Sequence, residues 1–129
     1  MIRTRWTLAV AAALVLSASC TAPAFAKADP QDGKPSFNCA KARKGSIDQV
    51  ICSDHELSNL DREMARRYIN AQKQTPRAAW PELIGEQRKW IASRNQCMGG
   101  KGKRIACIAF AYENRILRLV EWEDGSALD

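Results

Sequence analysis

Residues 53–70 read SDHELSNLDREMARRYIN, and the spacing of their apolar side chains decides the fold. These side chains recur at steps of three and four, at Leu57, Leu60, Met64 and Tyr68. Such steps place them along one face of an α-helix, which turns once in about 3.6 residues. Ser53 and Glu56 have the spacing of a capping box, so we predict that Ser53 caps the start of this helix.

Helices are predicted on both sides of this stretch. A second capping-box spacing, from Ser46 to Gln49, opens a short helix, and Pro81 suits the first turn of a longer one. The apolar positions that follow Pro81 are Leu83, Ile84, Trp90 and Ile91. A final helix ends near Gly125, and its apolar positions are Ile105, Ile108, Tyr112, Ile116 and Leu119. Since no segment alternates as a strand does, we predict an all-α fold, a small helical bundle of three main helices plus one or two short ones.

The chain begins with the pattern of a secretory signal peptide, residues 1–26. Arg3 and Arg5 form a basic start, residues 6–18 are almost wholly apolar, and Ala24-Phe25-Ala26 has the small-x-small pattern of a cleavage site. The apolar run is shorter than the ~20 residues that a membrane-spanning helix needs, so no membrane span is predicted. We expect cleavage near Ala26 and a periplasmic or secreted protein.

The remaining chain divides into three parts. Residues 27–36 are polar and contain two prolines and a glycine, so we expect a flexible leader. Residues 37–125 hold all the helical patterns and form the predicted domain, and residues 126–129 are a short tail. With 129 residues in the whole chain, one small domain is all that the length allows.

The cysteines agree with export. Cys20 lies inside the predicted signal; a lipoprotein anchored through it is less favoured, because Ser17 stands where a lipobox normally has leucine. The four other cysteines are Cys39, Cys52, Cys97 and Cys107. An even number in a small exported domain indicates two disulfides. We prefer the pairs close in sequence, Cys39–Cys52 and Cys97–Cys107, although crossed pairing stays open. A zinc site made by the four thiols is less favoured, because the sequence has no Cys-x-x-Cys pair.

Catalytic groups are scarce in this sequence. His55 is the only histidine, and the adjacent Ser53 and Asp54 do not make a catalytic triad, whose members usually come from distant segments. Without strands there is also no place for a glycine-rich phosphate loop. We therefore predict that the protein is not an enzyme and that it holds no metal or cofactor; its oligomeric state is not indicated by the sequence.

Two polar residues stand on or beside the predicted apolar faces. Arg94 shares a helix face with Leu83 and Trp90, and Asp61 follows Leu60 on the long helix of residues 53–70. A charged group on a buried face needs a partner. We predict a partly buried Asp61–Arg94 pair that fixes how the two helices align.

Charged surface segments are the candidates for binding. The formal net charge of +6 falls to +4 when Arg3 and Arg5 leave with the signal. Lys101, Lys103 and Arg104 lie between Cys97 and Cys107, so the preferred pairing makes them a closed basic loop. This loop is either a solvated turn or a contact for an anionic partner, such as a cell-wall polymer or an acidic protein cleft; export disfavours nucleic acid.

Three motifs together resemble the LprI-type lysozyme-inhibitor family of bacterial envelope proteins. They are Phe37-x-Cys39 with Ile51-Cys52-x-Asp54-x-Glu56-Leu57-x-x-Leu60-Asp61, Glu86-Gln87-Arg88-x-Trp90-x-x-x-Arg94-x-x-Cys97, and Cys107-x-x-x-x-Tyr112-x-x-Arg115-Ile116-x-x-Leu119. The resemblance extends over residues 37–119. It implies a small secreted or periplasmic helical domain with two disulfides, and it implies lysozyme as the partner.

The resemblance implies inhibition by non-covalent binding, for which the charges suggest two modes. Lys101 or Lys103 would enter the lysozyme cleft, which is lined with catalytic carboxylates. Alternatively, an acidic patch of Asp54, Glu56 and Asp61 would dock on the basic rim of the enzyme. A different class of function also fits, a non-catalytic envelope interaction or assembly domain whose partner is not lysozyme.

Overall fold

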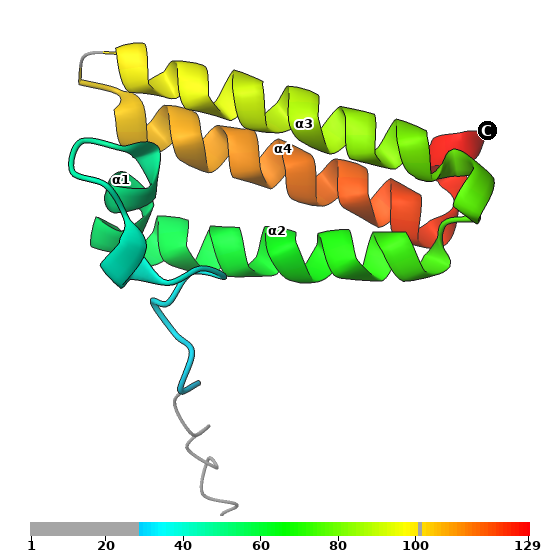
Figure 1. The fold of residues 1–129 in the computed structure, drawn as a ribbon, viewed down its shortest axis with the longest axis horizontal. Coiled ribbons are helices and arrows are strands. Elements are labelled where there is room, and N and C mark those ends of the chain that lie inside the picture. Colours follow the sequence, from blue (N-terminus) through cyan, green and yellow to red (C-terminus); the bar gives the residue numbers. More distant parts are fainter. Residues whose placement is uncertain (1–28, 101) are drawn as a thin grey trace, which may run out of the picture.

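The computed structural model describes residues 29–100 and 102–129 (Figure 1). The predicted signal peptide with Cys20 and Ala26 lies outside the described residues, and so does Lys101. The helices are α1 (Ile47–Ser53), α2 (His55–Gln74), α3 (Trp80–Gln96) and α4 (Arg104–Asp124). Short 3₁₀ helices are η1 (Cys39–Lys41), η2 (Arg77–Ala79), η3 (Cys97–Gly99) and η4 (Ser126–Leu128). The described part of the chain contains no strand, which confirms the predicted all-α bundle of three main helices and shorter ones.

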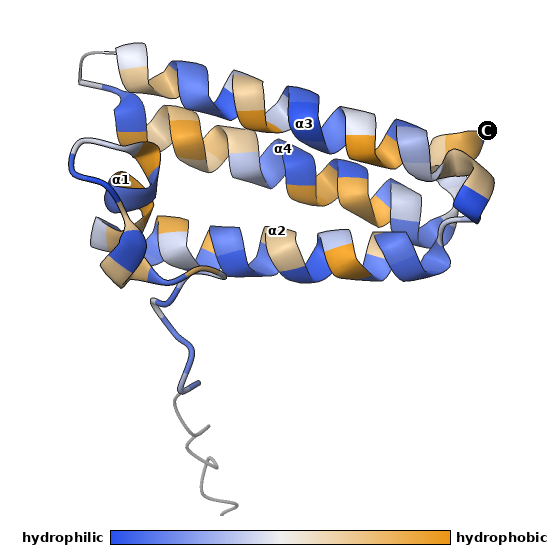
Figure 2. Cartoon of the chain, in the orientation of Figure 1, coloured by the Kyte–Doolittle hydropathy of each residue, from blue (hydrophilic) through white to orange (hydrophobic). Residues whose placement is uncertain are grey.

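The three long helices lie side by side, and α1 covers one end of the bundle (Figure 1). Helices α2 and α4 run in the same direction and share the largest interface, whereas α3 runs antiparallel along α4. Helix α1 packs on the start of α2, next to the turn that joins α3 to α4. Each long helix carries both apolar and polar residues, as an amphipathic helix in a small bundle must (Figure 2).

The start of α2 corrects one capping prediction. Ser53 is still part of α1, and its hydroxyl donates to the carbonyl of Gln49, 2.7 Å away. The extended residue between the two helices is Asp54, and its carboxylate accepts from the amide of Leu57 at 2.9 Å. Asp54, not Ser53, is therefore the N-cap, because α1 continues through Ser53, one residue further than the sequence pattern predicts. The other predicted cap is present, since Ser46 accepts from the amide of Gln49.

The helix ends follow from local sequence. Thr75-Pro76 ends α2, since the residue before a proline is disfavoured in helical conformation. The indole of Trp80 donates to the carbonyl of Thr75 at 3.1 Å and so fixes the turn into α3, whose first turn contains Pro81. Helix α4 ends at Gly125, whose φ of +87° is the left-handed conformation that favours glycine after a helix.

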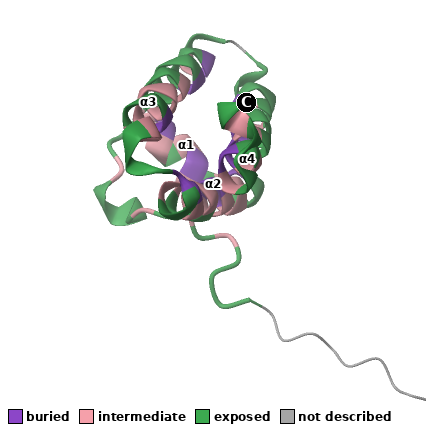
Figure 3. Cartoon of the chain, turned by 90° about the vertical axis from the view of Figure 1, so that its right-hand side faces the viewer, coloured by how far each residue is buried: buried purple, intermediate pink, exposed green. Residues whose placement is uncertain are grey.

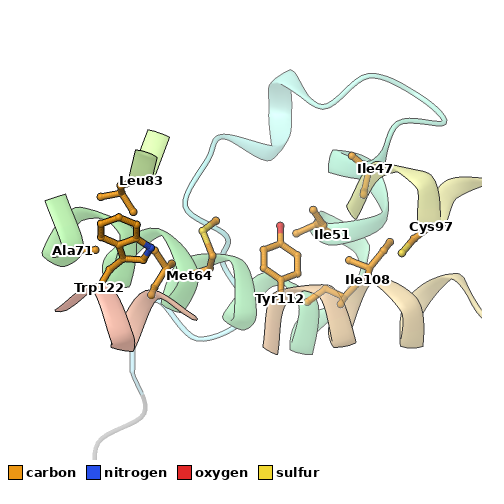
Figure 4. Packing of buried hydrophobic residues seen from close by; sticks show 11 residues of the cluster. Ile47, Ile51, Met64, Ala71, Leu83, Cys97, Ile108, Tyr112 and Trp122 are labelled. Atoms are coloured by element: carbon orange, nitrogen blue, oxygen red, sulfur yellow. The ribbon is translucent and has the colours of Figure 1, made fainter. Parts of the chain in front are cut away.

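The core lies between the helices, with buried residues turned toward the centre of the bundle (Figure 3). Ala71, Leu83 and Trp122 pack at one end, and Ile51 and Ile108 pack at the other (Figure 4). Two of the predicted apolar positions are instead surface residues: Ile91 is 39% exposed, and Ile105, in the first turn of α4, is 44% exposed.

Both disulfides join cysteines that are close in sequence. Cys39 pairs with Cys52, and Cys97 pairs with Cys107, with Cα–Cα distances of 5.8 and 5.6 Å. The first ties η1 to α1, and the second ties the end of α3 to the first turn of α4. The preferred pairing is confirmed, and both bridges lie at the α1 end of the bundle.

The described part of the predicted leader, residues 29–36, is hydrogen-bonded to α2. Asn59 accepts from the amide of Gly33 at 2.8 Å, and Arg62 pairs with Asp29 and donates to the carbonyl of Gln31. The sequence pattern of a flexible leader gives no sign of these contacts, because their partners lie some thirty residues away along the chain. No helix within residues 29–100 and 102–129 is long and apolar enough to cross a membrane.

Candidate functional site

An open groove of about 950 Å³ lies at the α1 end of the bundle, between α1 with the start of α2 and the first turns of α4. Its apolar lining comes from Val50, Ile105, Ala106 and Ala109. We call it the charged groove, because acidic and basic side chains line it together with these residues. The exposure of Ile105 follows from this position at the groove.

The charged groove brings together both predicted binding segments. Asp54 and Glu56 line it from the start of α2, and Lys103 and Arg104 line it from the start of α4. Gly100 and Gly102, the neighbours of Lys101, also line the groove. The sequence predicts each segment separately, but it does not predict that they meet, because about 50 residues separate them.

The four charged residues differ in how free they are to contact a partner. The carboxylate of Asp54 is engaged in capping α2, and Arg104 donates to the carbonyl of Met98 at 3.3 Å. Glu56 and Lys103 are exposed, and neither forms an ion pair within the described residues. Glu56 and Lys103 are therefore the charges that a partner can reach without disturbing the fold.

Asp61 and Arg94 come together away from this groove, inside the bundle. They are 3% and 9% exposed, as predicted for a partly buried pair, but the prediction of a direct pair is corrected: no ion pair joins them in the described part of the chain. The Tyr112 hydroxyl lies between them: it accepts from Arg94 Nη1 and donates to Asp61 Oδ1, each at 2.8 Å. Burial raises the pKa of Tyr112, and the neighbouring Asp61 raises it further, so the hydroxyl stays protonated.

Burial also corrects one surface prediction. Asp61 cannot belong to an exposed acidic patch, because its second carboxylate oxygen accepts from both the amide and the hydroxyl of Ser36, at 2.7 and 2.6 Å. Of the predicted acidic patch, only Asp54 and Glu56 line the groove.

A second polar cluster, which the sequence did not predict, joins α3 to α4. Glu86 accepts from Arg115, Arg118 and the Trp122 indole, at 2.9, 2.7 and 2.9 Å. Burial by itself would raise the pKa of Glu86, but these hydrogen bonds lower it to about 2. The sequence offers one indication of this cluster. Arg115 and Arg118 are three residues apart and so lie on the same side of one helix, and Glu86 and Gln87 lie on the helix that packs against it.

The described residues offer no evident centre for catalysis or metal binding. No group of three His, Cys, Asp or Glu side chains within residues 29–100 and 102–129 could hold a metal ion. The His55 side chain is 66% exposed and pairs with Asp32 at 3.0 Å. Ser53 donates to a backbone carbonyl, so it is not oriented toward His55 as a nucleophile.

These features define a class: a small all-α domain with two local disulfides and a surface groove of mixed charge. Residues 39–119 match the family model described as lysozyme inhibitor LprI. The chain belongs to this family.

Named relatives agree with this membership. Proteins called lipoprotein LprI from Mycobacterium bovis and from two strains of Mycobacterium tuberculosis are each 30% identical to this chain over 123 residues. The alignment takes in 95% of this chain and 59% of each relative, so the chain spans about three fifths of their length. No solved structure matches the chain.

Proposed function

We propose that this protein inhibits lysozyme by binding to it non-covalently through the charged groove. Its membership of the lysozyme inhibitor LprI family supports the choice of partner. The observation that carries the choice of surface is the position of Lys103 in a disulfide-closed loop, on the same open groove as Glu56.

The proposed contact matches the chemistry of the enzyme. A lysozyme cleft is lined with carboxylates, and Lys103 is an exposed cation held near the Cys97–Cys107 bridge. A loop closed by a disulfide loses less conformational freedom on binding than an open loop does, which favours affinity. Many lysozymes are basic like this chain, so their overall charges repel; the groove therefore has to attract through local charge pairs. Glu56 adds a carboxylate for a basic group on the rim of the cleft.

Charge reversal tests the surface. We expect Lys103→Glu to weaken lysozyme binding about tenfold, whereas Glu56→Lys would have the larger effect if the acidic wall made the main contact. Lys73→Glu is the matched control, because Lys73 is exposed in the last turn of α2, at the opposite end of the bundle. Binding is measured by calorimetry with purified lysozyme, and inhibition by a turbidity assay with several lysozyme types.

Two results would contradict the proposal at different levels. Equal affinity of wild type, Lys103→Glu and Glu56→Lys would exclude the charged groove as the contact. Failure to bind or inhibit any lysozyme type would exclude lysozyme as the partner. The second result would favour the other class of function, an envelope interaction or assembly domain with a different partner.

We also propose that the protein acts outside the cytoplasm after removal of residues 1–26. The signal-like pattern and the two disulfides support export, since disulfides persist in oxidising compartments. The relatives are named lipoproteins, which makes Cys20 the residue to test. Mass spectrometry of the protein from its natural host would find a chain beginning at Lys27; a chain beginning at an acylated Cys20 would overturn the cleavage prediction.

A further inference from the structure

A second groove lies on the surface between α3 and α4. It consists of two hollows of about 440 and 280 Å³, which adjoin at Trp90 and Asn114, the residues that line both. We call it the outer groove. Except for Gly100 at one end of the outer groove, none of its lining residues lines the charged groove, so the two surfaces are distinct.

One end of the outer groove is aromatic and neutral. Phe110 is 66% exposed there, although burial would stabilise such a side chain. Trp90 is fixed beside it, because its indole donates to the carbonyl of Ala111 at 2.9 Å and the guanidinium of Arg94 lies 5.1 Å from its ring centre. The polar side chains at this end are uncharged: Ser93, Gln96 and Asn114.

The other end of the outer groove is cationic. Lys89 is exposed and forms no ion pair within the described residues. Arg115 lines the same end and is 4% exposed, and its Nη2 has no hydrogen-bond partner among the residues that the structure describes. Glu86 also lines this end, but its carboxylate already accepts hydrogen bonds from Arg115 and Arg118. It therefore does not neutralise the charge of Lys89.

We propose that the outer groove binds an oligosaccharide that carries a carboxylate. Sugar rings have apolar faces that stack on exposed aromatic rings, here Phe110, and hydroxyl or amide groups that bond to uncharged side chains such as Gln96 and Asn114. Lys89 would then bind the carboxylate of the sugar. The step from residue 110 to residue 118 is about 12 Å along α4, which is long enough for more than one sugar ring.

The groove fits a saccharide better than an extended peptide. Both of its walls are helices, whose backbone groups are already hydrogen-bonded, so there is no strand edge with which a peptide backbone could pair. The mixture of an exposed aromatic ring, uncharged amides and a single unpaired lysine matches a sugar with an acidic substituent.

An NMR titration of the mature protein with two sugars tests this proposal. The acidic probe is the disaccharide of N-acetylglucosamine and N-acetylmuramic acid, and the neutral probe is diacetylchitobiose. We expect Phe110→Ala to weaken binding of both about tenfold, and Lys89→Glu to weaken binding of the acidic probe alone. The matched controls are Leu117→Ala, which truncates a side chain 65% exposed on the same helix but outside the groove lining, and Lys73→Glu.

Several outcomes would overturn the proposal. They are the absence of binding for both sugars, unchanged binding by Phe110→Ala, and equally tight, Phe110-dependent binding of a tetraglutamate peptide. Sedimentation that shows a dimer abolished by Phe110→Ala would also overturn it, since a second copy would then occupy the groove. The proposal does not depend on lysozyme inhibition: Phe110→Ala should leave lysozyme affinity, measured without polysaccharide, unchanged.

Discussion

Asp61 and Tyr112 are joined across the interface of α2 and α4 by a hydrogen bond of 2.8 Å, in which the tyrosine hydroxyl is the donor. The same hydroxyl accepts from Arg94 on α3. One side chain therefore links all three long helices, and the charges of Asp61 and Arg94 are compensated through it. The stability of this buried hydrogen-bond network depends on all three side chains, because a buried polar group without a partner costs free energy.

Removing this hydroxyl should destabilise the fold without leaving a large cavity. We expect Tyr112→Phe to lower the free energy of unfolding by about 2 kcal/mol, because Asp61 and Arg94 both lose a buried partner. Urea denaturation followed by circular dichroism measures the change. Tyr68→Phe is the control, since Tyr68 is only half-buried; equal effects of the two substitutions would show that the hydroxyl of Tyr112 has no special role.

Truncating Arg94 should cost more than removing the hydroxyl. Arg94 donates to Tyr112 and lies over the rings of both Trp90 and Tyr112, so Arg94→Ala removes packing as well as charge. We expect a loss of about 3 kcal/mol in the free energy of unfolding. Arg88→Ala, at an exposed position of the same helix, should change it by less than about 0.5 kcal/mol. A loss below that value for Arg94→Ala would mean that the buried network does not stabilise the domain.

Acid should weaken the domain through Glu86. Its pKa is about 2 in the folded protein and 4.5 for the unperturbed group, so the folded state favours the ionised form. That contribution is fully present above pH 4.5 and is lost as the pH falls from 4.5 toward 2. A shift of this size corresponds to about 3 kcal/mol at most, and partial exposure of the side chain reduces it.

The variant Glu86→Gln isolates this effect. At neutral pH it should be less stable than wild type by about 2 kcal/mol, and the two proteins should become similar near pH 2. Thermal unfolding over a series of pH values measures the difference. Parallel stability curves for the two proteins between pH 4.5 and 2 would contradict the assignment. The other carboxylates with lowered pKa values, Asp32, Glu63 and Asp124, are unchanged in the variant and so affect both curves alike.

Sequence periodicity predicted the helices because helix-forming faces are local patterns. The apolar residues spaced three and four apart in residues 53–70 lie on α2. Each cysteine of the two bridges pairs with the cysteine nearest to it in the sequence. Burial at the helix ends was harder to predict. Nothing in the sequence near the end of the last helix indicates that Trp122 is buried. It is nevertheless 1% exposed, because Glu86 from α3 accepts its indole N–H and it packs against Ala71 and Leu83 (Figure 4).

The candidate site was likewise predictable from the sequence only in part. The charges of Lys103 and Glu56 are visible in the sequence, but their meeting at one groove depends on how α1 and α4 pack. The sequence predicts that Asp61 and Arg94 meet, because both are polar positions on or beside apolar faces. It does not predict that Tyr112 lies between them in place of a direct ion pair, because the tyrosine ring fits the apolar pattern, which takes no account of its hydroxyl.

The N-terminal contacts lead to a prediction about Ser36. Its hydroxyl and its amide both donate to Asp61, so the segment before α1 supports the buried network from outside. We expect Ser36→Ala to lower the free energy of unfolding by about 1 kcal/mol, since the amide donor remains. Hydrogen exchange of the Ser36 amide, or chemical denaturation, measures the effect. Ser126→Ala is a control at the other terminus, where the hydroxyl bonds only to Asp124; an effect of Ser36→Ala no larger than this control would show that the segment does not support the core.

The Cys97–Cys107 bridge connects stability to the proposed binding. It closes a loop with a sequence separation of 10, and the chain-entropy model gives such a bridge about 3 kcal/mol of stabilisation. The double variant Cys97→Ala/Cys107→Ala should lose about that much and should also bind lysozyme more weakly, because Lys103 is then no longer held at the groove. The variant Cys39→Ala/Cys52→Ala should lose a similar free energy of unfolding, since its sequence separation is 13, while Lys103 keeps its position. The lysozyme affinities of the two double variants are compared by calorimetry at a temperature where both are folded. Since both lose a similar free energy of unfolding, a difference in affinity between them reports on the placement of Lys103. If both variants bind lysozyme as tightly as the wild type, the closed loop has no part in recognition.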